Sequence, residues 1–139
     1  MAKSDDLEQA GLEYWLTTGA PVIGTRPTTW FIALFTADPT DADITANEVD
    51  VVVDDTAYVR KAVTFGVTAD TASNITAATI FDAVVYGSGA APYDITHFGI
   101  YDASTVGNLL YHGALNNPKT LAAGEQANFD IGDINITEA

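Results

Sequence analysis

The chain has 139 residues, of which 19 are acidic and 5 are basic, giving a formal net charge of −14. Nucleic-acid binding depends on Lys and Arg side chains that neutralise phosphates, so this charge argues against nucleic acid and against an anionic membrane as partners. The length predicts one domain with its own core, and the lack of cysteine excludes disulfides, thiolate metal sites and a cysteine nucleophile.

The N-terminal end combines a polar start with a predicted helix. Residues 1–6 are polar, and no apolar run approaches the roughly 20 residues of a membrane span. We therefore expect a soluble protein that is made in the cytoplasm without export. A helix is predicted over about residues 5–17, because Asp5 followed by Glu8 resembles a capping box, with Ser4 as a second cap candidate.

The predicted helix carries an uneven apolar stripe and ends before a loop rich in Gly and Pro. Gly19 supplies a stop signal, so residues 1–19 are expected to form a helical arm and residues 28–139 a separate β-domain. The arm either packs on that domain or reaches a neighbouring chain. Four residues of the stripe are therefore candidate protein-interface residues: Leu7, Leu12, Trp15 and Leu16.

After the loop the apolar period changes from helical to alternating. Residues 29–36 are nearly all apolar, aromatic or β-branched, which predicts a strand buried on both faces. Further strands are expected at residues 58–65, 74–81 (which residues 83–86 extend or follow), 96–101, 108–115 and 127–137, with turns or breaks at 87–92, 102–107, 116–118 and 132–133.

This order of elements predicts an all-β fold. Residues 96–101 and 108–115 are expected to form a hairpin, with Phe98 and Ile100 on one face and His97 and Tyr101 on the other. No helical period recurs after residue 17, which argues against a βαβ architecture. We predict a β-sandwich or jelly-roll-like domain of about seven to eight short antiparallel strands with one N-terminal helix.

An acidic segment, residues 37–55, contains seven carboxylates and no base. Closely spaced carboxylates can hold a hard cation such as calcium. The ordered carboxylate spacing of an EF-hand loop is absent, however. We favour a solvated loop over a dedicated metal site, and weak cation binding stays open.

His97 and His112 lie on strands that are predicted to be neighbours. Two histidines that face each other can bind a transition metal or act as a pH switch. Since no third ligand is apparent, ordinary sheet residues are the favoured interpretation. We predict no metal and no cofactor.

No catalytic motif stands out. Residues 87–89 (GSG) lack the G-x-S-x-G pattern of a nucleophile elbow, and neither a P-loop nor a dinucleotide fingerprint occurs. Paired carboxylates for glycoside hydrolysis stay open as an alternative, but nothing singles out a pair. We predict that the protein is not an enzyme and has no catalytic residues.

The order of several segments resembles the small structural proteins of tailed bacteriophages known as tail-fibre, minor structural or head-decoration proteins. The matching segments are TTWFIALFTADPTDAD, AYVRKAVTF, SNITAATIFD, ITHFGIYDASTVGNLLYHGAL and LAAGEQANFDIGDINIT. The hairpin HFGIYDA…GNLLYHGAL, followed by a Gly-containing turn and a final strand, is the most specific part. The acidic segment and the GSGAAP turn depart from the pattern.

The resemblance implies a non-enzymatic β-sandwich subunit that is located in the virion. Since a compact acidic domain lacks the shaft and tip of a receptor-binding fibre, we favour a capsid decoration (cement) protein that binds between capsomers. Its expected partners are the major capsid protein or another virion protein and further copies of itself, with a homotrimer favoured. The alternative is a tail-fibre, tail-tip or baseplate component involved in host attachment. A carbohydrate-binding or hydrolytic domain is a third, weaker hypothesis.

Overall fold

The computed structural model describes residues 2–18, 27–56, 58–68, 71–75, 79–82, 92–122 and 125–137. These residues form antiparallel sheets and one α-helix, which confirms the predicted all-β class. The elements are β1 (Ala2–Lys3), α1 (Asp5–Leu16), β2 (Trp30–Phe35), the 3₁₀ turn η1 (Thr45–Asn47), β3 (Lys61–Val63), β4 (Phe65–Thr68), β5 (Thr71–Asn74), β6 (Thr79–Asp82), β7 (Tyr93–Tyr101), β8 (Leu109–Leu121), β9 (Gln126–Phe129) and β10 (Asn135–Thr137).

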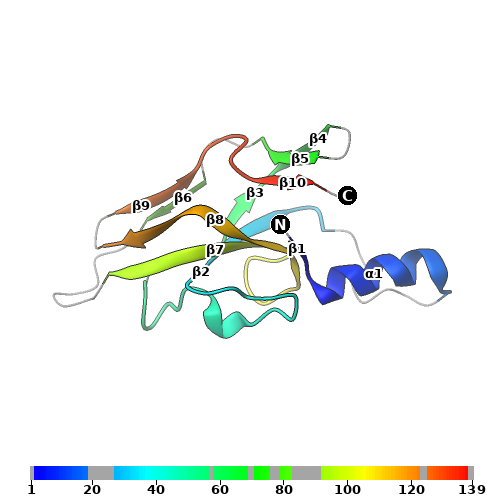
Figure 1. The fold of residues 1–139 in the computed structure, drawn as a ribbon, viewed down its shortest axis with the longest axis horizontal. Helices are drawn as coiled ribbons and strands as arrows, with labels where there is room; N and C mark the ends of the chain where they lie inside the picture. The colour runs from blue at the N-terminus through cyan, green and yellow to red at the C-terminus, as the bar shows by residue number, and fades with distance from the viewer. Residues whose placement is uncertain are drawn as a thin grey trace.

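Two layers of sheet enclose the main core. The larger sheet has the order β1-β8-β7-β2-β3, and the smaller sheets β10-β5-β4 and β6-β9 lie above it in Figure 1. Ile32, Leu34 and Ile100 of the large sheet pack in one cluster with Phe129 and Ile136 of the opposite layer. This arrangement is the predicted β-sandwich.

The large sheet is buried on its other face as well. Ala33, Phe35, Tyr101 and Leu109 form a second, smaller cluster and are fully buried. Gly99 lies among them, where an added Cβ would approach the side chains of Leu109 and Phe35 to 2.8 and 2.9 Å. The prediction that residues 29–36 contain a strand buried on both faces is therefore confirmed.

Two predicted strands are in fact divided between sheets. The segment 58–65 was expected to be one strand, but β3 ends at Val63 and β4 begins at Phe65 in another sheet. Between them, the carbonyl of Thr64 accepts a hydrogen bond from the amide of Ile75 at 2.8 Å. The segment 74–81 is likewise divided, because β5 ends at Asn74 and β6 begins at Thr79. The expected strand 83–86 and most of the turn at 87–92 lie outside the described residues.

The expected break at residues 116–118 is a bulge inside β8. Ile95 pairs with Lys119 whereas His97 pairs with Ala114, so two steps along β7 correspond to five along β8. The extra residues of β8 include Pro118, which has no amide hydrogen to donate to a ladder and is therefore compatible with a bulge. The sequence correctly marked an irregularity here, but the strand continues past it.

The turn expected at residues 132–133 depends on a buried asparagine. Gly132 has a φ of +86°, and the amide of Asp133 donates to the carbonyl of Asp130 at 3.0 Å. The side-chain oxygen of Asn74 accepts from the amides of Gly132 and Ile134, each at 3.0 Å, and its Nδ2 donates to Asp130 at 2.9 Å. Since Asn74 is fully buried, its side chain makes the hydrogen bonds to the turn that water makes to an exposed turn.

Asn74→Ala should destabilise the protein by about 2–4 kcal/mol, because it removes the acceptor of the buried Ile134 amide and the donor to Asp130. Asn135→Ala, at an exposed asparagine of the same turn, is the control and should cost at most about 1 kcal/mol. Urea unfolding of both variants measures these free energies. Equal losses would show that the Asn74 side chain does not hold the turn.

Candidate functional site

The acidic segment covers the outer face of the large sheet. Its residues lie below this sheet in Figure 1, with Pro39 fully buried, whereas Val49 packs in the main core. The amide of Val49 donates to the carbonyl of Leu34 on β2 at 3.0 Å. Most residues of the segment are exposed, as expected of a solvated loop, while the buried residues Pro39, Val49 and Asp55 hold it to the sheet as a structural cover.

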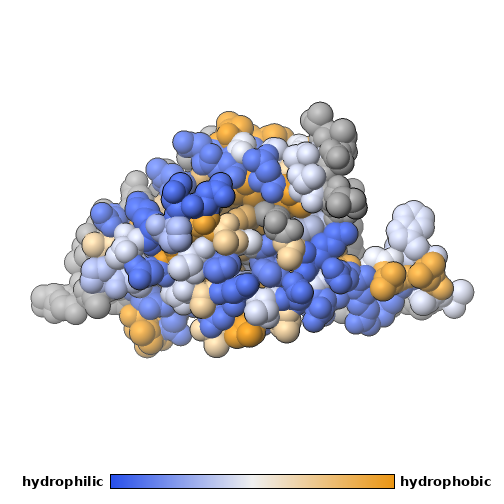
Figure 2. All heavy atoms as spheres, in the orientation of Figure 1, coloured by the Kyte–Doolittle hydropathy of each residue, from blue (hydrophilic) through white to orange (hydrophobic). Residues whose placement is uncertain are grey.

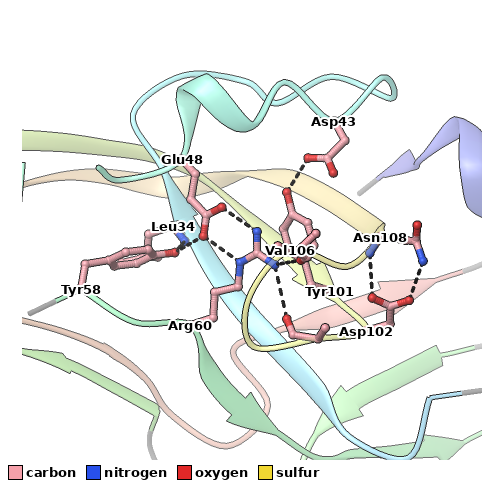
Figure 3. A network of polar contacts seen from close by, with 10 residues as sticks. Leu34, Asp43, Glu48, Tyr58, Arg60, Tyr101, Asp102, Val106 and Asn108 are labelled. Atoms are coloured by element: carbon pink, nitrogen blue, oxygen red, sulfur yellow. Dashed lines mark hydrogen bonds and ion pairs between the residues drawn. The ribbon is translucent and has the colours of Figure 1, made fainter. Parts of the chain in front are cut away.

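Arg60 fixes this cover to the sheet (Figure 3). Its Nε and Nη2 donate to the two carboxylate oxygens of Glu48 at 2.8 and 2.7 Å, and Nη1 donates to the carbonyls of Ala103 and Val106. The guanidinium carbon lies 3.4 Å from the centre of the Tyr101 ring. The side chains of Arg60 and Glu48 are only 6% and 14% exposed. A bidentate, stacked and buried ion pair of this kind fixes geometry.

Two phenols complete the network. The Tyr58 hydroxyl donates to Glu48 at 2.8 Å and accepts from the amide of Leu34 at 3.0 Å, and the Tyr101 hydroxyl donates to Asp43. Burial, reinforced by the negative charge of Glu48, raises the pKa of Tyr58 far above its usual value. Burial and the hydrogen bond to Asp43 do the same to the pKa of Tyr101. Both phenols stay neutral at ordinary pH, which makes them structural donors and poor nucleophiles or bases.

The Arg60 guanidinium is firmly held in its charged form. Burial lowers the pKa of Arg60, but the hydrogen bonds to Glu48 and the nearby negative charge outweigh this effect and leave the pKa raised. Its charge is opposed directly by Glu48, so the network contributes no unbalanced positive charge to attract an anionic ligand. We interpret the network as a clamp for the acidic segment.

The histidines lie on neighbouring strands, as predicted, but they do not face each other. His97 is opposite Ala114 and His112 is opposite Gly99. The Nε2 of His112 lies 2.8 Å from Asp41, and its Nδ1 lies 3.3 Å from Asp38. Within the described ranges no group of three or more His, Asp or Glu residues has the geometry to hold a metal ion.

The base of helix α1 is attached to the sheet at several points. Ser4 is the N-cap, since its side chain accepts a hydrogen bond from the amide of Leu7 at 3.3 Å. The predicted capping box that starts at Asp5 is therefore wrong, and the second cap candidate, Ser4, is correct. The amide and hydroxyl of Ser4 donate to the carbonyls of Leu110 and Leu109, and the amide of Asp5 donates to Asp41. β1 pairs with β8 directly before the helix.

The free end of α1 projects away from the body and is apolar (Figure 1 and Figure 2). Trp15 is 80% exposed and Leu16 is 76% exposed; Leu12 is also exposed, whereas Leu7 is half-buried. Tyr14, which the predicted interface omitted, is exposed and contacts Trp15 edge-on with ring centres 5.0 Å apart. Leu12, Trp15 and Leu16 have the i, i+3, i+4 spacing of one helix face. We name these three residues the α1 tip.

A groove of about 650 Å³ opens between the two layers near the β8 bulge. Phe98 and Phe129, whose ring centres are 6.1 Å apart, lie at its apolar floor, and Leu115 of the bulge also lines it. Lys119, Asn128 and Asp133 are among its polar lining residues. The sequence pattern does not predict this groove, and the break at residues 116–118 is its only signal.

Comparison with known proteins identifies a family. A family model described as "Podophage GP4 fiber I protein gp80" matches residues 2–137 of the chain. The match includes α1 and all of the strands described above. No curated protein matches the chain. No helix in the described part of the chain is long and apolar enough to span a membrane.

Arg60→Ala should destabilise the protein by about 3–5 kcal/mol, because it leaves the carboxylate of Glu48 buried without its partner. The double variant Arg60→Met with Glu48→Leu should lose less, since neither charge is then left alone. Lys61→Ala, at the neighbouring base, should change the free energy of unfolding by about 0.5 kcal/mol or less. A chemical denaturation series on the four proteins would contradict the clamp if Arg60→Ala behaved like Lys61→Ala.

The free energy of unfolding should fall as the pH rises above about 10. In the unfolded chain Tyr58 and Tyr101 ionise near pH 10, whereas their raised pKa values keep them protonated in the folded protein. The unfolded state therefore binds fewer protons, and stability decreases with pH. Tyr58→Phe should show a shallower decrease than the wild type when unfolding is measured across the alkaline range. Tyr14→Phe controls for the substitution at an exposed site, and an unchanged slope in Tyr58→Phe would refute the assignment.

Proposed function

We propose that this chain, which belongs to the podophage GP4 fiber I protein gp80 family of tailed-phage structural proteins, is a non-enzymatic subunit of the fibre apparatus of the virion. The observation that carries the proposal is the extent of the family match, which includes both the sandwich and α1. The family is described as a fibre protein, and we transfer that role to this chain.

The side chains support a structural role. Arg60, Glu48 and the buried phenols are occupied in holding the cover segment to the sheet. The α1 tip, in contrast, exposes a large aromatic and two leucines on a helix whose printed hydrogen bonds to the sheet and the acidic segment lie at its base. Exposed apolar groups of this kind are typical of protein contacts. The expected partner is another virion protein or a further copy of the chain.

Head decoration is the competing proposal. The sequence favoured it because the chain is compact and acidic and lacks a shaft. The description of the family as a fibre protein supports the alternative prediction of a tail component. A compact sandwich can be one segment or an attachment module of a fibre, so the lack of a shaft within this chain does not oppose that alternative.

The location and copy number of the protein in purified particles test the proposal. We expect it to remain with isolated tails or detached fibres, in a low copy number that matches the symmetry of the tail. Quantitative mass spectrometry of separated heads and tails measures both quantities. Saturation of the capsid in very many copies would establish decoration instead, and absence from intact particles would refute both roles.

A further inference from the structure

The apolar residues near the free end of α1 lie on the side of the helix that its own domain does not use. Ala10 is the one buried residue of α1. Because successive residues turn by about 100°, the α1 tip lies on the opposite side of the helix from Ala10. Helices of this length are marginal in water unless an apolar face packs against something. The tip is therefore a packing surface that the domain leaves uncovered, and Figure 2 shows it as apolar atoms at the end of the projection.

The tip lies between two regions of negative charge. Glu8 is exposed and lies one turn before Leu12, on the same side of the helix. At the other end, the last turn contains no basic residue, so the partial negative charge of the helix C-terminus is not compensated within α1. Glu8 and Leu16 are about 12 Å apart along the axis. A surface complementary to the tip is therefore apolar in its centre and carries basic residues at both ends.

A second copy of the chain does not match this description. The chain has 19 acidic residues and 5 basic ones, and one of the basic ones, Arg60, is buried against Glu48. Two chains with a net charge of −14 repel each other as they approach. Contact between two tips would also bring together two negative helix ends and two copies of Glu8. The charges therefore favour a different protein as the partner.

We propose that the α1 tip binds an apolar groove, with basic residues at both ends, on a different protein of the virion. The inference rests on the proposed function, since it specifies how a fibre subunit is joined to its neighbour. An amphipathic helix that enters a groove uses anchors at i, i+3 and i+4, which is the spacing of Leu12, Trp15 and Leu16. Trp15 supplies the main anchor, and the charges guide the approach.

Pairwise co-expression tests the partner and the surface together. The probes are the other structural proteins encoded by the same phage, each co-expressed with the full chain and then purified with it. One of them should remain bound to the wild type. Trp15→Glu should weaken this binding at least roughly 30-fold, as expected for a hot-spot residue, and circular dichroism should show an unchanged fold because the position is 80% exposed. Val52→Glu, at a residue that is also 80% exposed, should bind like the wild type.

The salt dependence of binding tests the charges. Glu8→Gln keeps the size of the side chain and removes its charge, so binding to the basic groove should be about two- to fivefold weaker at low ionic strength. The difference should disappear near 1 M salt, where the Debye length is only about 3 Å. Glu125→Gln, at an exposed acid between β8 and β9, is the matched control and should bind like the wild type at both ionic strengths. Equal binding by Glu8→Gln and the wild type at low salt would overturn the basic groove.

Sedimentation of the purified chain tests the exclusion of a second copy. The oligomeric state of the wild type should be unaffected by Trp15→Glu. An oligomer that this substitution dissociates would show that the tip binds another copy, and it would overturn the inference. The inference is equally wrong if no structural protein of the phage is retained, or if one is retained as well by Trp15→Glu as by the wild type.

These results are separate from the proposed function. A chain that binds a partner through the tip but is found with isolated heads would refute the fibre role and leave the contact in place. A chain that is found in fibres, and enters them equally well as Trp15→Glu, would refute the contact and leave the fibre role in place.

Discussion

Burial of both faces of the five-stranded sheet is the constraint on which the rest of the structure depends. One face packs against the smaller sheets, which provide apolar side chains in the ordinary way. The other face is covered by a segment that is rich in carboxylates and contributes few buried apolar groups there, chiefly Pro39, since Val49 packs in the main core. The ion pair between Arg60 and Glu48 fixes the position of this cover. Buried ion pairs contribute little net stability but penalise every arrangement that separates them, so this pair selects one position for the cover.

The same constraint explains why several carboxylates of this strongly acidic protein are held by hydrogen bonds within the fold. Glu48 is bound by Arg60 and Tyr58, Asp43 accepts from Tyr101, and Asp55 accepts from Tyr93 at 2.9 Å. Asp43 and Asp55 join the cover to β7, and Glu48 joins it to the segment that leads into β3. Much of the acidity that first resembled a cation site is therefore part of the fold, which agrees with the structural character of the family.

The parts of the fold that were predictable are those specified by neighbouring residues. The apolar run in β2 and the alternation of Phe98 and Ile100 in β7 depend on local period, and both predictions are confirmed. The acidic cover depends on Arg60 and Tyr101, which are distant in sequence, and local pattern could not reveal it. The division of residues 58–65 between two sheets at Thr64, and the hydrogen bonds of Asn74 to the turn before β10, also depend on residues that are distant in sequence. The exposed tip was predictable from an apolar stripe on a short helix, whereas the groove requires the packing of two layers and was not.

The attachment of α1 has a mechanical consequence. A helix of 12 residues is about 18 Å long, and here it is fixed at one end by a two-residue strand, Ser4 and a single backbone bond to Asp41. Its attachment to the sheet through residues 2–5 is therefore weaker than the backbone hydrogen bonds that hold the helix itself together. A sideways force on the outer turn would be concentrated on the short ladder between β1 and β8, which would separate before the helix unwound or the sandwich opened. Under load, α1 would be released at these first residues, and the domain itself would keep its shape.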